Sequence, residues 1–196
     1  MTIEYLKKAD KTAASGEDDT RKIVSDMLSA IEAGGEDKVR EYAAKLDNYT
    51  GNIVVTPEEI AAATAKVPQQ VKDDIQFSYD RVRGFAEKQR AALVDFEVEL
   101  SPGLFAGQKQ IPVATAGCYV PGGRYSHVAS AVMSVATAKA AGVDHVIACS
   151  PPKPGAGVNP AIIYTANLCG ADTILALGGV QGIAAMAFGL FTGHAA

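Results

Sequence analysis

Two polar side chains in the second half of the sequence occupy positions where a cofactor could bind. Tyr119 lies near the end of an apolar run that stops in Pro121-Gly122-Gly123, and Gln181 follows a second glycine pair, Gly178-Gly179. An aromatic ring can lie against a base or sugar, and an amide both donates and accepts hydrogen bonds. We therefore take Tyr119, Gln181, Gly122 and Gly179 as candidate cofactor-binding residues. A tyrosine buried in the core and a glutamine that caps a helix are the structural alternatives.

Three successive strand-helix units would position these residues. Strands are predicted before the turn at residues 121–123, at residues 144–150 and at residues 173–177. The helices that follow them are predicted at residues 126–141, 160–168 and 183–191. Such units give parallel strands with right-handed crossovers, so their carboxyl ends meet at one edge of a sheet. Because helix N-termini at that edge favour anionic groups, a dinucleotide is the expected ligand.

The standard nucleotide-binding motifs are absent from the sequence. Neither glycine pair matches Gly-x-Gly-x-x-Gly, and there is no Gly-x-x-x-x-Gly-Lys-[Ser/Thr] loop. Asp144 lies at the start of the second predicted strand, whereas the acidic residue that holds a ribose lies at the end of that strand. Ser150 occupies the end instead. A nucleotide-hydrolysing loop of the usual form is thereby excluded.

The composition narrows the class of protein. The sequence has 196 residues, of which 48% are hydrophobic and 20% charged, with a formal net charge of -4. A mildly acidic chain is a poor partner for nucleic acid, because binding to phosphates needs a basic face. No apolar run is long enough to span a membrane, and the first residues contain no signal-peptide core. We expect a cytoplasmic protein that contacts neither nucleic acid nor membrane.

No metal site is predicted within the sequence. Buried free thiols in a reducing compartment are expected at three positions, Cys118, Cys149 and Cys169. The sequence has no Cys-x-x-Cys or His-x-x-x-His pair, and its histidines, His127, His145 and His194, are far apart.

The first half of the sequence is predicted to be mainly helical. Helices are expected at residues 2–9, 20–33, 36–46, 57–67 and 68–93, the fourth beginning in a capping box of Thr56 and Glu59. Residues 96–100 alternate as a half-exposed strand, and residues 104–113 return antiparallel to it. The fold class is α/β, with a helical arm at 1–17, a helical and β segment at 18–116, and an incomplete Rossmann-like domain at 117–196.

Four ordered segments resemble the histidinol dehydrogenase family. They are Gly117-Cys118-Tyr119-Val120-Pro121-Gly122-Gly123, Ala138-Lys139-Ala140-Ala141-Gly142-Val143, Cys149-Ser150-Pro151-Pro152 and Gly178-Gly179-Val180-Gln181-Gly182-Ile183-Ala184-Ala185. The sequence is most similar to the sulfopropanediol 3-dehydrogenase branch of that family. The segments that indicate this branch are residues 3–9, residues 123–127 and Gly179-Val180-Gln181. At the last of these, biosynthetic histidinol enzymes usually have Gly-Ala-Gln.

The resemblance implies NAD-dependent oxidation of a small polar alcohol by a zinc-containing homodimer, in which Tyr119 and Gln181 contact NAD. Family members are much longer, and their zinc ligands and catalytic Glu-His pair follow the region that this sequence matches. We therefore expect this chain to be the amino-terminal half, inactive alone, with weak or absent NAD binding and a bare sheet edge that promotes association. The alternatives are a histidinol dehydrogenase of histidine biosynthesis, a non-catalytic module that binds a nucleotide or a partner, and an incomplete gene product.

Overall fold

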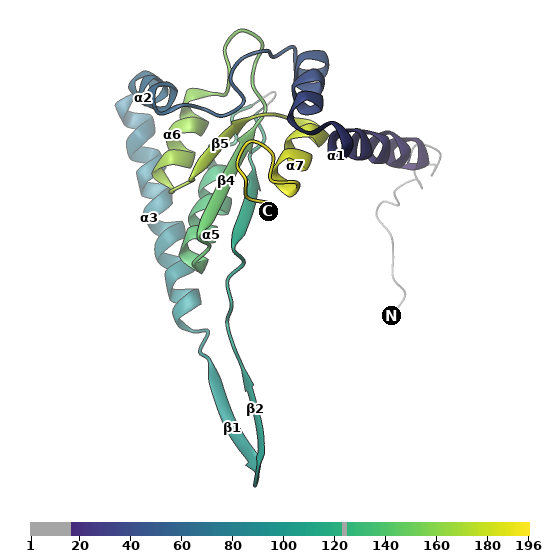
Figure 1. The fold of residues 1–196 in the computed structure, drawn as a ribbon. Coiled ribbons are helices and arrows are strands. Elements are labelled where there is room, and N and C mark those ends of the chain that lie inside the picture. The colour runs from purple at the N-terminus through teal and green to yellow at the C-terminus, as the bar shows by residue number, and fades with distance from the viewer. Residues whose placement is uncertain (1–16, 123–124) are drawn as a thin grey trace, which may run out of the picture.

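A computed structural model of the protein describes residues 17–122 and 125–196 (Figure 1). The helix predicted at residues 2–9 lies outside these residues. The elements in chain order are α1 Glu17–Asp47, α2 Pro57–Lys66, α3 Gln69–Ala91, β1 Phe96–Ser101, β2 Leu104–Gln108, β3 Thr115–Tyr119, α4 Val128–Ala131, the π-helix Val132–Ala136, α5 Thr137–Ala141, β4 His145–Ser150, α6 Pro160–Leu168, β5 Thr173–Ala176 and α7 Gly179–Ala187. Among the described residues, no helix has the length and apolarity to cross a membrane.

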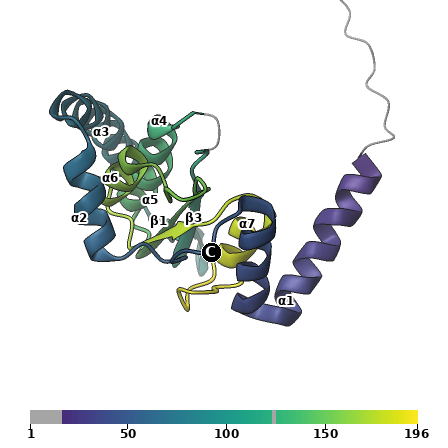
Figure 2. The same ribbon diagram turned by 90° about the horizontal axis from the view of Figure 1, so that it is seen from above.

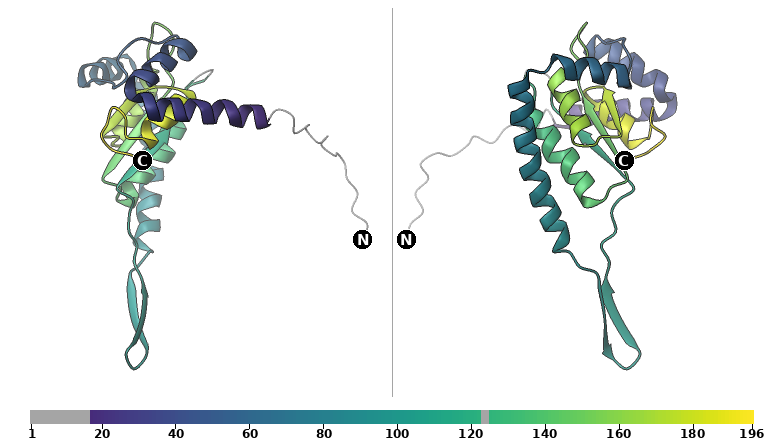
Figure 3. Two further views of the ribbon diagram at one scale, coloured as in Figure 1. Left: turned by 45° about the vertical axis from the view of Figure 1, so that its right-hand side comes forward. Right: turned by 90° about the vertical axis from the view of Figure 1, so that its left-hand side faces the viewer.

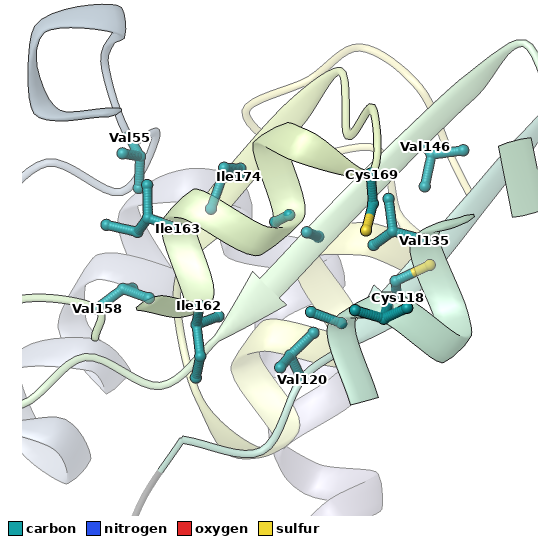
Figure 4. Packing of buried hydrophobic residues seen from close by; sticks show 14 of the residues in the cluster. Val55, Cys118, Val120, Val135, Val146, Val158, Ile162, Ile163, Cys169 and Ile174 are labelled. Atoms are coloured by element: carbon teal, nitrogen blue, oxygen red, sulfur yellow. The ribbon is translucent and has the colours of Figure 1, made fainter. Parts of the chain in front are cut away.

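The strands β3, β4 and β5 form a parallel sheet in that order, which confirms the predicted strand-helix units. Alternate residues of β4 enter two different cores, because successive side chains of a strand point to opposite faces. Val146 and Ala148 pack with α6 and the helix that begins at Val128, as Figure 4 shows for one side of the sheet. Ile147 and Cys149 pack on the other side against α1 and α7. Both faces of the sheet are therefore covered, as Figure 2 shows from above.

The helices at the amino terminus follow the signals in the sequence. Gly35 interrupts α1 with a φ of 60° and a ψ of -145°, so the two helices predicted at residues 20–33 and 36–46 are confirmed. Glycine adopts this left-handed backbone without the steric cost that a Cβ would bring. The predicted capping box is also present, since Thr56 accepts from the backbone N–H of Glu59 and the Glu59 carboxylate accepts from the N–H of Thr56.

The helix after the first turn differs from its prediction. It begins at Val128 rather than Ser126, and a π-helix separates α4 from α5. The hydroxyls of Ser134 and Thr137 donate to carbonyl oxygens of the same helix, at 2.7 Å and 3.1 Å. These small hydroxyls therefore bond within their own helix, while the wider π-helical turn has no signal in the sequence.

The outer edge of β5 is already occupied. Val55 donates its N–H to the carbonyl of Ile174 at 2.9 Å, and Ala176 donates its N–H to the carbonyl of Ile53 at 2.7 Å. The outer edge of β3 pairs with no strand in the described part of the chain. The expected bare edge is therefore that of β3, and the expected association stays a prediction.

The hairpin of β1 and β2 extends away from the sheet (Figures 1 and 3). Its antiparallel pairing is as predicted, but β2 ends at Gln108 rather than at residue 113. The prediction of one buried face is wrong, because every residue of both strands is exposed. Phe96, Val98 and Leu100, which share one face of β1, are between 46% and 64% exposed. Alternation indicates a strand with an apolar face, but it does not show whether the described chain covers that face.

The amino-terminal ends of β4 and β5 are joined by a charged cluster whose effect on stability depends on pH. Asp172 accepts from Lys139 Nζ at 2.6 Å and from the N–H of Val146 at 2.7 Å. Burial by itself would raise the pKa of Asp172, but these two hydrogen bonds outweigh it and hold the pKa below its usual value of 3.8. Folding stability from this cluster is therefore fully present above pH 3.8 and is lost as the pH falls through the lowered pKa.

Replacing Asp172 by asparagine is expected to reduce stability at neutral pH by about 1 kcal/mol, because the amide makes weaker hydrogen bonds to a partly exposed cation. The variant should also lose less stability on acidification than the unsubstituted protein. Urea unfolding at several pH values measures both effects. Asp144→Asn is the matched control, because Lys139 bonds the carbonyl oxygen of Asp144 rather than its carboxylate. Equal acid sensitivity in all three proteins would contradict the assignment.

Candidate functional site

The carboxyl ends of the parallel strands form a rim that brings distant residues together. Tyr119 ends β3, and its hydroxyl oxygen accepts a hydrogen bond from the N–H of Gly179 at 3.2 Å. Gly179 lies just after β5, so this bond joins two candidate residues that are 60 positions apart. Because the oxygen acts as the acceptor here, the proton of the Tyr119 hydroxyl can be donated elsewhere.

Gln181 lies in the first turn of α7, which begins at Gly179 rather than at the predicted residue 183. Its side chain is 1% exposed, and its Nε2 donates to Asp47 Oδ2 at 2.8 Å. Its Oε1 is buried and has no hydrogen-bond partner. The alternative of a helix cap is wrong, because Gly178 is the N-cap residue and no side chain caps this helix.

The turn at the end of β3 is packed tightly on the end of β4. Gly122 is buried, and a Cβ added there would lie 2.7 Å from Ser150 Oγ and 3.4 Å from Ile162 Cδ1. Ser150 is 1% exposed, and its Oγ also has no partner. Buried polar atoms without partners are uncommon in folded proteins, and a hydrogen bond from a ligand is one explanation for them.

Glycine is also required on the other side of the rim. A Cβ at Gly178 would lie 2.8 Å from Pro151 Cβ and 3.3 Å from Asp47 Oδ1, while Gly179 has a φ of 52°. A Cβ at Gly179 would lie 3.3 Å from Gln181 Oε1. Because glycine has no side chain at these two positions, the Tyr119 hydroxyl, the Gln181 amide and the start of α7 lie side by side.

Asp47 is a residue of this site that we did not predict from the sequence. It is the last residue of α1, and the next residue, Asn48, has a left-handed φ of 49°. A negative charge at a helix C-terminus is electrostatically unfavourable, so an aspartate there is a weak sequence signal for another role. Its partner Gln181 is 134 residues away, a separation that helical or strand periodicity does not reveal.

The cysteines and histidines form no catalytic or metal centre among the described residues. All three cysteines are buried free thiols, as predicted, and burial raises the pKa of Cys149 to about 12, so it is a poor nucleophile. His145 and His194 stack with ring centroids 4.0 Å apart, at the amino-terminal end of β4 and away from the rim. No group of three or more His, Cys, Asp or Glu residues that could hold a metal occurs in residues 17–122 and 125–196.

Two hollows lie away from the rim. One of about 530 Å³ runs along the base of the exposed hairpin between Asp95 and Lys109. The other, of about 640 Å³, lies between the end of α3 and residues 110–112. Neither brings together buried polar atoms without partners, so we place the candidate site at the rim.

Comparisons with known proteins agree with the resemblance seen in the sequence. The sequence profile of the family described as histidinol dehydrogenase matches residues 10–195. A sulfopropanediol 3-dehydrogenase of Ruegeria pomeroyi is 61% identical over 97% of this chain and 44% of its own length. A histidinol dehydrogenase of Methanosarcina barkeri is 38% identical over 91% of this chain and 41% of its own length.

The fold has a close counterpart among solved structures. The crystal structure of histidinol dehydrogenase from Elizabethkingia anophelis superposes with a TM-score of 0.81 at 28% identity, over 96% of this chain and 41% of the solved chain. The chain thus spans less than half the length of the relatives that it matches. With a profile match over nearly all of its residues, it belongs to the histidinol dehydrogenase family.

Proposed function

We propose that the protein is an NAD-dependent dehydrogenase that oxidises a small polar alcohol, and that NAD binds at the rim formed by Tyr119, Gly122, Gly179 and Gln181. The observation that carries the proposal is the unpaired Oε1 of Gln181, a buried acceptor beside the Tyr119–Gly179 hydrogen bond. The family is a dehydrogenase family, which supports the reaction class.

The polar groups of the rim suit a dinucleotide. Gln181 Oε1 offers an acceptor for a hydroxyl or amide proton, and the Tyr119 hydroxyl can donate to an oxygen. The amino-terminal end of α7 favours an anionic group such as a phosphate. NAD, when bound, supplies the acceptor for the hydride. These residues would bind and orient it, and in this chain we assign none of them to proton transfer.

Zinc does not fit the described residues, because they contain no cluster of potential ligands. We therefore derive no catalytic step from a metal ion in this chain. If the complete protein holds zinc, the proposal places the ligands outside these residues. The proposal also includes a homodimer, as the resemblance implies, and a location in the cytoplasm, as expected from the sequence.

Sulfopropanediol is the proposed substrate, because identity to the sulfopropanediol enzyme, at 61%, far exceeds the 38% to a histidinol enzyme. Histidinol is the second candidate, since the superposed crystal structure is a histidinol dehydrogenase. A module that binds a nucleotide without catalysis would bind NAD but oxidise neither alcohol.

The test is an NADH-formation assay with the protein expressed from its complete reading frame. We expect kcat/KM for sulfopropanediol to exceed that for histidinol by about a hundredfold or more, because a site built to hydrogen-bond one polar group rejects an analogue that lacks it. The reverse preference would assign the protein to histidine biosynthesis. NAD binding without oxidation of either alcohol would contradict the proposed substrate.

A further inference from the structure

Asp47 and Gln181 form a pair that links α1 to the rim. The amide nitrogen of Gln181 donates to Asp47 Oδ2 at 2.8 Å, and Gln181 is 1% exposed. An ionised carboxylate only accepts hydrogen bonds, so it can face the nitrogen of the amide but not the oxygen. The charge of Asp47 therefore fixes which end of the amide points away from it. That end is Oε1, the atom that has no partner.

Two features of the surrounding backbone hold this pair in place. Asp47 lies directly under the glycine turn, because a Cβ at Gly178 would come within 3.3 Å of Oδ1 and 3.4 Å of Oδ2. The left-handed φ of Asn48, 49°, turns the chain away immediately after Asp47. A carboxylate at a helix C-terminus gains nothing from the helix dipole, so the hydrogen bond to Gln181 is the favourable contact that the structure gives it.

We propose that Asp47 is a positioning residue that fixes Gln181 as a hydrogen-bond acceptor for the cofactor. The rim then recognises a donor group of the dinucleotide, a ribose hydroxyl or a carboxamide N–H, through Oε1. A phosphate oxygen can only accept hydrogen bonds, so it does not bind at Oε1. It binds instead at the start of α7. This inference rests on the proposed function, because it assumes that NAD binds at the rim.

A double-mutant cycle on the protein from its complete reading frame tests the inference, with NAD affinity measured by calorimetry. Asp47→Ala is expected to weaken NAD binding about tenfold, the size of one hydrogen bond. Asp47→Asn should also weaken NAD binding, though less than Asp47→Ala, because an asparagine side chain can either accept from Gln181 Nε2 or donate to Oε1 and so no longer fixes one orientation of the amide. In a Gln181→Ala background, Asp47→Ala should cause no further loss, because its effect acts through Gln181.

The outcomes separate this inference from the function on which it rests. An Asp47→Ala loss of the same size in both backgrounds would mean a structural role and would overturn it, as would unchanged affinity in the single variant. Thermal unfolding monitors folding in each variant, and Asp47→Asn carries the test if Asp47→Ala does not fold. Unsubstituted protein that fails to bind NAD would instead refute the proposed function itself.

Discussion

NAD binding is expected to weaken by at least about tenfold when Gln181 is replaced by alanine, while the zinc content of the complete protein stays unchanged. The substitution removes the buried acceptor Oε1 that we assign to the cofactor, a loss of about 1 to 1.5 kcal/mol for one hydrogen bond. It also leaves Asp47 without the donor that it has at 2.8 Å. Calorimetry with NAD and metal analysis of the same preparation measure the two quantities.

Tyr119→Phe is the matched comparison for this result. It removes one hydroxyl that bonds the N–H of Gly179 and retains the ring, so a smaller loss of NAD affinity is expected. Zinc content should again be unaffected, because no potential metal ligand is changed. If Gln181→Ala lowered NAD affinity and zinc content to the same degree, Gln181 would be a structural residue.

A Cβ at Gly122 is expected to destabilise the fold by about 1 to 3 kcal/mol, the usual cost of inserting an atom into a packed interior. In Gly122→Ala the new carbon would lie 2.7 Å from Ser150 Oγ. It could not move far from that atom, because the carbonyl oxygen of Pro151 and Ile162 Cδ1 each lie 3.4 Å from it. The turn should move outward, so NAD affinity should fall together with stability. Urea unfolding and calorimetry measure these effects.

Removing the obstructing atom supplies the control. Ser150→Ala should recover much of the stability in the Gly122→Ala background, because Ser150 Oγ is the nearest atom to the added carbon. By itself Ser150→Ala is expected to be nearly neutral, since that oxygen is buried and has no partner to lose. Additive destabilisation by the two substitutions would show that their side chains do not meet.

The parallel sheet could be predicted because local patterns carry it. Short apolar runs, the Asn159 cap and the helix-ending glycine Gly142 each act within a few residues, and the structure contains each of them. The capping box of Thr56 and Glu59 is local in the same sense. Such signals need no knowledge of tertiary contacts, so the sequence alone reveals them.

The features that escaped prediction depend on contacts between distant residues. Asp47 meets Gln181 across 134 positions, and residues 53–55 pair with β5, without a periodic pattern that predicts either contact. The exposure of the hairpin at Phe96 and Val98 likewise depends on what packs against it rather than on its own alternation. Tyr119 and Gln181 were found because strand ends and glycine turns mark the rim, but their mutual arrangement required coordinates.

The pairing of Ile53 and Val55 with β5 leaves β3 as the edge strand at which the sheet can be extended. A further strand, from the same polypeptide or from another one, can extend the hydrogen-bonded ladder beside β3, because residues 53–55 occupy the outer side of β5 and no strand in the described part of the chain occupies that of β3. A parallel strand added there would reverse the sequential order, and doubly wound sheets bind ligands at such a reversal. Tyr119, at the carboxyl end of β3, would then lie at the opening of the crevice between β3 and the added strand.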